Sequence, residues 1–381
     1  MTIKKACKVF DNLNRFIKNH HVKNLILNQL FIFVLSVLSA FSQINTTEIK
    51  QQKSKTSEQN ISLFDSEEPL EISLRFDLAG YLKKSSKGDS FDAVMTIHFS
   101  KTDSLDKKIT IKYRGTSRFQ RCKFPPIQLN FNKPVYINSD SVKTKKLKLV
   151  NHCEQGTMYD EYVLREYLVY KLFNVLTDTS FRVRLLKVNY MDTKRSRKPI
   201  TQYGFFIEPI ELLAGRTNSF VVKATNLSQK HIIPVIMDRL AIFNYMISNW
   251  DWSIPGQHNV AIIKPIKNDV TGLGIAIPFD FDLTGVVNAD YAIPPPGMEI
   301  TTNRERLFSG ICRSKEVFQE DLKIFLNKKE KLYSVINGFP YLNQRAKKDI
   351  TNFLDQFFDQ LEKQKSLDNL VDCFLNSCKK L

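Results

Sequence analysis

Residues 234–287 read PVIMDRLAIFNYMISNWDWSIPGQHNVAIIKPIKNDVTGLGIAIPFDFDLTGVV. The first part predicts an apolar helix, because large hydrophobic side chains recur there at three- and four-residue steps. Pro234 suits the first turn of this helix, where a missing N–H costs little. Two strand-like runs follow, residues 260–263 and 273–278, on either side of a polar turn at 267–271. The stretch therefore predicts a helix, a loop and a β-hairpin, in that order.

Polar residues stand at each junction of this stretch. Asp251 follows the helix, Asn259 follows a loop containing Pro255 and Gly256, and Asp280 ends the second strand-like run. This order is typical of a phosphoryl-transfer site, in which one carboxylate orients or deprotonates the acceptor hydroxyl while an Asn and a later Asp hold Mg²⁺. We therefore assign the catalytic role to Asp251 and the metal to Asn259 and Asp280, with Asp282 as a second ligand or a structural partner. Taken singly, each residue could instead be a helix cap or a turn former.

The ordered motifs N-W-D, H-N and I-P-F-D-F-D resemble those of the secreted kinase-like family of the spore-coat protein CotH. Family members typically end the last motif in W-D-x-D, and Phe279 stands here where the Trp is usual. The resemblance extends over residues 70–339. It implies an α+β, two-lobed, atypical protein-kinase-like fold with a sheet-rich N-terminal lobe and a helical C-terminal lobe. It also implies transfer of the ATP γ-phosphoryl group to a protein hydroxyl with Mg²⁺.

A polar turn upstream is a candidate for binding phosphates. Residues 114–118 read RGTSR and lead through Lys123 into a strand-like run at 127–131. A turn with Gly and hydroxyl side chains, followed by a Lys, can cradle phosphates. A similar R-G-x-S segment in the family implies that Lys123 contacts the nucleotide, with Arg114 and Arg118 as further candidates. An ordinary basic hairpin would explain the same residues.

Two glutamates complete the set that the resemblance implies. Residues 160–176 predict an amphipathic helix, with Asp160 suited to its N-terminus. Glu166 on this helix would pair with the nucleotide lysine, as in kinases at large; the alternative is an exposed Glu on a surface helix. The segment G-F-F-I-E-P-I resembles a family segment and places Glu208 or Glu211 near a hinge that holds the nucleotide.

The N-terminal residues predict export. A basic leader precedes an apolar run at 25–41 and small residues near Ser42, which is typical of a secretory signal cut at that point. An uncleaved membrane anchor is the alternative. The protein would then be periplasmic, secreted or at the cell surface. The predicted organisation is a signal peptide or anchor (1–43), a disordered linker (44–68), an N-terminal lobe (69–190), a C-terminal lobe (191–340) and terminal helices (341–381).

The charge and the cysteines limit the partners. The chain carries a net charge of +17, of which residues 1–43 hold +5. Such an excess favours nucleotides or acidic substrates, and no nucleic-acid motif accompanies it. The five cysteines beyond Cys7 have no metal-site spacing, so one or two disulfides of unassigned pairing are expected instead of a zinc site. A protein phosphoacceptor is the expected partner, and a membrane only if the leader is uncleaved. A catalytically inactive pseudokinase and a structural or adhesive surface protein remain as alternatives.

Overall fold

The computed structural model describes residues 60–380 except 62, 65, 138–142, 225 and 267–271. The signal peptide or anchor, linker residues 44–59, 62 and 65, and the polar turn at 267–271 therefore lie outside the described residues. The linker was predicted to be disordered up to residue 68, and its described end corrects this: Asn60–Ile61 form a strand, and Ile61 and Leu63 are fully buried. Residues 61–381 form one compact unit. In the part of the chain that is described, no helix has the length and apolar character needed to span a membrane.

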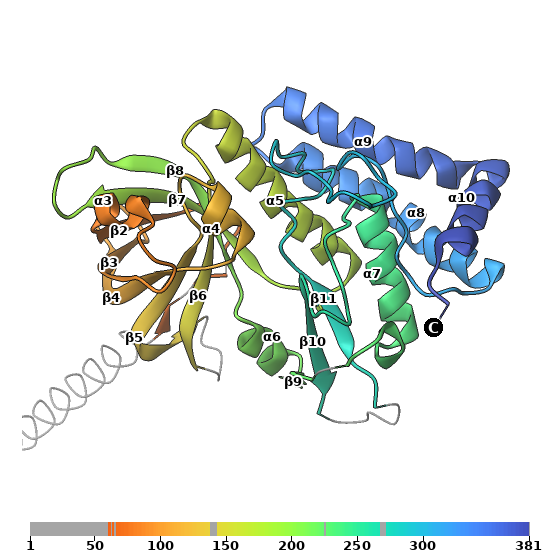
Figure 1. The fold of residues 1–381 in the computed structure, drawn as a ribbon, viewed down its shortest axis with the longest axis horizontal. Helices are drawn as coiled ribbons and strands as arrows, with labels where there is room; N and C mark the ends of the chain where they lie inside the picture. Colours follow the sequence, from red (N-terminus) through yellow and green to blue (C-terminus); the bar gives the residue numbers. More distant parts are fainter. Residues whose placement is uncertain are drawn as a thin grey trace, which may run out of the picture. The chain divides into compact units, whose positions relative to one another are not determined.

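Seven strands close into a mixed barrel (Figure 1). The order around the barrel is β5-β4-β3-β2-β7-β8-β6, and β6 pairs back onto β5. Only the β2–β7 pair is parallel among these neighbours. Ile61 of a short strand, β1 (Asn60–Ile61), adds to β5. The barrel strands are β2 (Leu70–Phe76), β3 (Ser90–His98), β4 (Ser104–Tyr113), β5 (Ile127–Ile137), β6 (Lys143–Asn151), β7 (Val183–Asp192) and β8 (Ile200–Ile207).

Alternation of side chains fills the barrel. Ile109 and Ile111 on β4, and Leu147 and Leu149 on β6, point into a continuous apolar interior. The residue between the last two, Lys148, points outwards. Closure pairs every strand on both sides, which removes the free edges of an open sheet.

The expectation of a two-lobed kinase-like fold, with a sheet-rich N-terminal lobe and a helical C-terminal lobe, is wrong. The N-terminal sheet is a closed barrel, because β6 pairs with both β5 and β8. The C-terminal region is not purely helical either, since it contains a three-stranded antiparallel sheet, β11-β10-β9. Alternation along a strand predicts which side is buried but does not say which strand is its neighbour.

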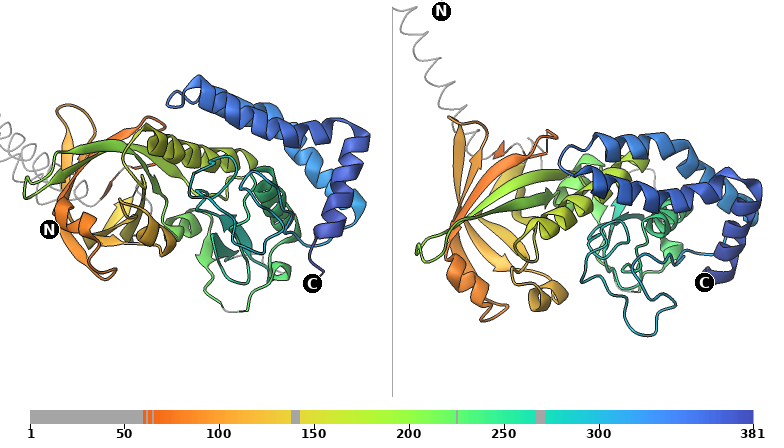
Figure 2. Two further views of the ribbon diagram at one scale, coloured as in Figure 1. Left: turned by 45° about the horizontal axis from the view of Figure 1, so that its top comes forward. Right: turned by 90° about the horizontal axis from the view of Figure 1, so that it is seen from above.

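Helix α5 (Thr157–Leu176) lies between the barrel and the helices that end the chain (Figure 2). It packs on β7 and β8 on one side and on α8 on the other, and its apolar residues belong to a second core shared with the C-terminal region. The other elements are α3 (Leu78–Lys83), α4 (Ser117–Arg121), α6 (Ile210–Arg216), β9 (Ser219–Val221), the 3₁₀ turn η1 (Gln229–His231), α7 (Pro234–Met246), β10 (Val260–Pro265), β11 (Ile275–Pro278), α8 (Lys315–Gly338), α9 (Gln344–Glu362) and α10 (Gln364–Ser377).

The local predictions for the key stretch are largely confirmed. The helix begins at Pro234 and ends at Met246, so Trp250, the last large apolar residue before Asp251, lies beyond it. The hairpin is formed by β10 and β11, with Val260 opposite Pro278. Helix α5 begins before Asp160, at Thr157, so this carboxylate does not cap it. Instead, Asp160 Oδ1 accepts a hydrogen bond from the backbone N–H of Tyr203 on β8 at 2.9 Å. This bond connects the helix to the barrel.

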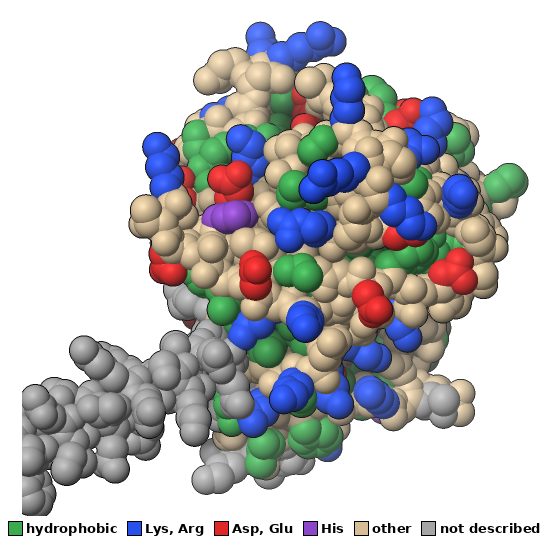
Figure 3. Space-filling model, turned by 90° about the vertical axis from the view of Figure 1, so that its left-hand side faces the viewer, with side chains coloured by type: hydrophobic (Ala, Val, Ile, Leu, Met, Phe, Trp, Pro, Cys, Tyr) green, Lys and Arg blue, Asp and Glu red, His purple; other side chains and the backbone are tan. Residues whose placement is uncertain are grey.

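Two disulfides are formed, as is common in proteins of oxidising compartments. Cys122, after helix α4, pairs with Cys153, just beyond the end of β6, and Cys312 pairs with Cys378 at the end of α10. Cys373 is a free, exposed thiol. On the barrel side of the molecule, Lys and Arg side chains are spread over the surface with Asp and Glu among them (Figure 3). The positive excess is therefore not gathered into one patch on this face.

Candidate active site

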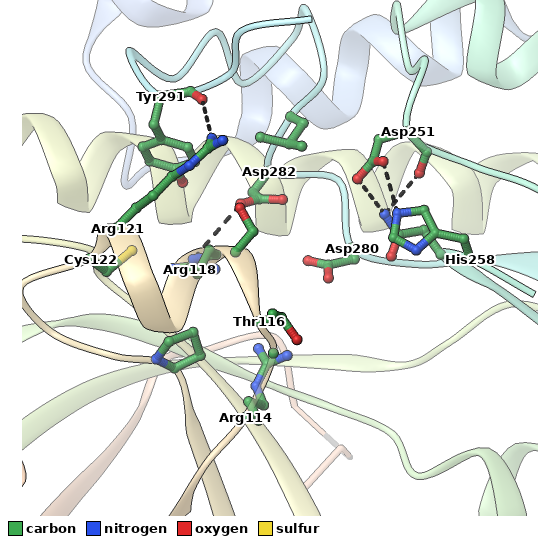
Figure 4. Close-up of a pocket in the computed structure, with 15 residues that line it drawn as sticks. Arg114, Thr116, Arg118, Arg121, Cys122, Asp251, His258, Asp280, Asp282 and Tyr291 are labelled. Atoms are coloured by element: carbon green, nitrogen blue, oxygen red, sulfur yellow. Dashed lines mark hydrogen bonds and ion pairs between the residues drawn. The ribbon is translucent and has the colours of Figure 1, made fainter. Parts of the chain in front are cut away.

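A pocket of about 410 Å³ lies between the barrel and the C-terminal region, within the range of ~300–1,000 Å³ usual for ligand sites. The turn after β4 and helix α4 supply basic and hydroxyl side chains on one side, while the loops around β10 and β11 supply carboxylates on the other (Figure 4). The polar residues that line it are Arg114, Thr116, Ser117, Arg118, Arg121, Asp251, His258, Asn259, Asp280, Asp282 and Tyr291.

Asp251 lies just before a narrow loop whose two ends, Ser253 and His258, are hydrogen-bonded to each other. Backbone hydrogen bonds pair Ser253 with His258 in both directions, at 3.0 Å each. The Pro255–Gly256 turn between them brings Asn259 beside Asp251. The Asn259 side-chain N–H donates to the Asp251 backbone oxygen at 2.8 Å and to its Oδ2 at 2.9 Å. The two residues predicted to share the chemistry are therefore direct partners.

Both carboxylate oxygens of Asp251 have a neighbour. His258 Nε2 lies 2.8 Å from Oδ1 (Figure 4), and Asn259 occupies Oδ2. The Asp251 side chain keeps 24% of its surface exposed, so an incoming group can reach it. Because the Asn259 nitrogen is used as a donor, its amide oxygen is the atom left to act as a ligand.

Asp280 takes a backbone conformation that side chains rarely adopt. Its φ of 64° lies in the left-handed region, which costs a non-glycine residue on the order of 1 kcal/mol or more. Its backbone N–H donates to the hydroxyl of Tyr170 on α5 at 2.8 Å. Strain of this kind, held by surrounding contacts, is typical of functional sites.

Asp282 and Glu166 form a buried acidic pair behind Asp280. Both are almost fully buried, and Glu166 Oε1 has no hydrogen-bond partner. Burial, followed by the charge of Asp280, raises the pKa of Asp282 to about 7. Burial, followed by the charge of Asp282, also raises the pKa of Glu166 well above its usual value. Carboxyls packed this closely are stabilised by protonation or by a cation.

One arginine partly balances these carboxyls. Arg118 Nε lies 3.8 Å from Asp282 Oδ2, and its Nη2 donates to the backbone oxygen of Asn151 at 2.6 Å. Arg114 reaches the backbone oxygen of Leu149 at 3.5 Å. The two guanidinium groups therefore stand opposite the acidic cluster, where they could bind phosphate oxygens.

The residues present fit a magnesium ion without forming a closed cage. Carboxylate and amide oxygens are the ligands that Mg²⁺ prefers, and it usually takes one or two protein carboxylates, with water and phosphate oxygens completing the shell. Within the described ranges, no three His, Cys, Asp or Glu side chains converge closely enough to hold a metal by themselves. Asn259, Asp280 and Asp282 fit a site that is completed by nucleotide phosphates.

A second hollow lies between β6 and the β9–β10 strands, and its lining includes Phe279, the residue before Asp280. Its walls are largely apolar and include Ile207, Pro209 and Phe279, with Lys148 among its polar residues. The Lys148 ammonium lies 4.5 Å from the centre of the Phe279 ring. Surrounding protein, then the charge of Arg114, lowers the pKa of Lys148, while Asp280 and Glu211 oppose this shift. Lys148 therefore stands between the apolar hollow and the acidic cluster.

The structure separates three of the predicted nucleotide contacts from the pocket lining. Lys123 is 77% exposed and pairs with Glu154, so it meets neither the pocket nor Glu166. Glu166 lies buried behind the pocket. Glu208 is fully buried and accepts hydrogen bonds from Arg182 and Arg216. Its role is therefore structural, in the wall of the second hollow.

Sequence reasoning missed Lys148, Arg121 and Tyr291. Lys148 could have been found, because it is the one charged residue in the run Leu147–Val150 and its neighbours alternate towards the core. Arg121 donates to the backbone oxygen of Tyr291 at 3.3 Å. That contact spans 170 residues of sequence, and no local pattern indicates it.

Comparisons with models of known protein families and with curated proteins found no match for this chain. The chemistry of the pocket is therefore the basis for assigning a function.

Proposed function

We propose that this protein is an exported, CotH-like phosphotransferase that moves the γ-phosphoryl group of ATP to a protein hydroxyl. One observation carries the proposal: the Asp251–Asn259 pair, the strained Asp280 and the buried Asp282 meet in one pocket opposite Arg114 and Arg118. Phosphoryl transfer depends mainly on positioning and on charge stabilisation, and this pocket offers groups for both.

The carboxylate of Asp251 would accept or orient the proton of the acceptor hydroxyl. Its contact with Asn259 fixes its orientation, and its partial exposure leaves it open to a substrate. Asn259, Asp280 and Asp282 would hold Mg²⁺, which supplies charge neutralisation at the β- and γ-phosphates when bound. Arg114 and Arg118 would bind the same phosphates from the barrel side.

The second hollow suits the base of the nucleotide. Apolar walls with a few polar groups are usual for planar ligands, and Phe279 contributes an aromatic ring there. Lys148 lies between this hollow and Asp280. We therefore assign to Lys148 the phosphate contact that the sequence had suggested for Lys123.

A nucleotide-binding pseudokinase is the second candidate, and one observation favours it. Both oxygens of Asp251 are already engaged, by His258 and by Asn259, so the carboxylate could be purely structural. In that case the protein would bind ATP and Mg²⁺ without transfer. A structural or adhesive role would need neither ligand.

Thermal unfolding with and without ATP and Mg²⁺ tests the proposal. Ligand at one hundred times its dissociation constant should stabilise the protein by about 2.7 kcal/mol. Asp280→Asn should abolish the Mg²⁺-dependent part of this shift while the protein stays folded. The exposed Asp92→Asn is the control and should keep the full shift. No shift in the unchanged protein would overturn nucleotide binding and leave the structural role.

Export is the remaining part of the proposal. The two disulfides are compatible with an oxidising compartment, and the predicted leader supplies the route. N-terminal sequencing of exported material should find a start near Gln43. An intact Met1 would favour the uncleaved anchor.

A further inference from the structure

Helix α4 carries two of the arginines that line the pocket, yet it has little packing of its own. It has five residues, 117–121, and no buried side chain. Helices shorter than ~12–15 residues are marginal in water without tertiary support. Phe119 is partly buried against Tyr113, with ring centres 4.9 Å apart. Arg118 and Arg121 make hydrogen bonds of their own to Asn151 and Tyr291, and the backbone between them is further held by the connections at the ends of the helix.

The C-terminal end of α4 is held by a covalent bond and by polar contacts. Cys122 directly follows the helix, lines the pocket and is bonded to Cys153, just beyond the end of β6. The backbone N–H of Phe124 donates to the Cys153 oxygen at 2.9 Å. Lys84 Nζ donates to the Cys122 oxygen at 3.1 Å. The disulfide is the only covalent cross-link among these.

The same corner of the barrel receives Arg118. Its Nη2 donates to the backbone oxygen of Asn151, two residues before Cys153. The Asn151 side chain accepts from the N–H of Ile127 and donates to the Pro125 oxygen, at 3.0 and 3.1 Å. The disulfide therefore joins α4 to the strand end that Arg118 must reach.

We infer that the Cys122–Cys153 disulfide is a positioning element of the phosphate-binding side of the site. It fixes the end of α4 on β6 and so keeps Arg118 and Arg121 over the pocket. This inference rests on the proposed nucleotide site. Opening the bond would leave the barrel closed, because the strands are paired independently of it, but would free α4 and weaken binding of the phosphates.

The redox step has a defined balance. A dithiol such as dithiothreitol attacks one sulfur, the S–S bond breaks, and Cys122 and Cys153 become thiols. The dithiol supplies two electrons and two protons and becomes a cyclic disulfide. The second disulfide, Cys312–Cys378, ties the end of α10 to the segment before α8 and has no residue in the pocket. It is a matched control for the loss of a cross-link.

The test compares Cys122→Ala/Cys153→Ala with Cys312→Ala/Cys378→Ala at a temperature well below unfolding. Calorimetry with Mg²⁺-ATP should show a rise in Kd of about tenfold or more for the first pair and no change for the second. Hydrogen exchange at the α4 amides, including Gln120 and Cys122, should speed up in the first pair alone. If the first pair fails to fold, reduction of folded Cys312→Ala/Cys378→Ala with dithiothreitol replaces it, because Cys122–Cys153 is then the disulfide left in the described part of the chain; the thiols formed are counted by mass.

Unchanged affinity and unchanged α4 exchange after loss of Cys122–Cys153 would overturn the inference. Equal weakening by both pairs would also overturn it, because a general loss of stability would then explain the effect. If the unsubstituted protein binds no ATP, the proposed function fails, and the exchange of the α4 amides still decides whether the disulfide positions this helix.

Discussion

Replacement of Asp282 by Asn should change how the stability of the metal-free protein depends on pH. Burial and the charge of Asp280 raise the pKa of the folded carboxyl from 3.8 to about 7. The folded state thus holds this proton more tightly than the unfolded state. The protonated Asp282 carboxyl therefore stabilises the fold fully below its unfolded-state pKa of 3.8, and this stabilisation is lost as the pH rises through about 7. Above that pH, the buried carboxylate destabilises the fold.

The magnitude follows from the size of the shift. One pKa unit corresponds to about 1.4 kcal/mol, so about three units give at most about 4 kcal/mol above pH 7. About 2–3 kcal/mol of this is gained between pH 5 and pH 8. An Asn carries no charge to bury. The free energy of unfolding of Asp282→Asn, measured against the unsubstituted protein, should therefore rise by that amount over this range.

Urea unfolding at pH 5 and pH 8, with a chelator present, measures this difference. Asp92→Asn is the control because its carboxyl is exposed, and its difference from the unsubstituted protein should not vary with pH. Groups common to all three proteins cancel in the comparison. If the curves for Asp282→Asn and the unsubstituted protein stay parallel from pH 5 to pH 8, Asp282 does not titrate in this range and the reasoning about the acidic cluster fails.

Further predictions concern the second hollow and its support. Lys148→Ala should raise the Kd for Mg²⁺-ATP at least about tenfold, as measured by calorimetry. Lys123→Ala should leave this Kd unchanged. The reverse result would show that Lys123, and not Lys148, contacts the nucleotide. Glu208→Gln should destabilise the fold by about 1.5–3 kcal/mol, because it removes the buried charge to which Arg182 and Arg216 donate and leaves one neutral acceptor oxygen. Urea unfolding checks this, and a loss below about 1 kcal/mol would show that the arginines are solvated instead.

Local periodicity predicted the elements whose partners are close in sequence. The α7 helix, the β10–β11 hairpin and most of helix α5 each follow from the pattern of their own residues. The closure of the barrel does not. It depends on the parallel pairing of β2 with β7, which places Leu70 opposite Leu186, and on β8 pairing with β6. Each of these strands is half-buried in either arrangement, so alternation cannot choose between them.

The candidate site divides in the same way. Asp251, Asn259, Asp280 and Asp282 lie within 32 residues of each other, and their order alone predicted one pocket. The barrel side was harder, because the turn that suggested Lys123 points that side chain into solvent. The residues that face the pocket from the barrel side are placed by the closure of the barrel and by the Cys122–Cys153 disulfide. The spacing of the cysteines did not indicate that pairing.

Transfer of labelled phosphate from ATP, measured on the unsubstituted protein and on Asp251→Asn, tests the central claim most directly. The two proteins should show the same ATP-induced rise in Tm, because Asp251 does not hold the phosphates. Transfer to hydroxyl-rich or acidic protein acceptors should fall by a factor on the order of 10² or more in Asp251→Asn. Equal transfer by both proteins would contradict the catalytic role of Asp251. A shift in Tm without any transfer by the unsubstituted protein would establish the pseudokinase instead.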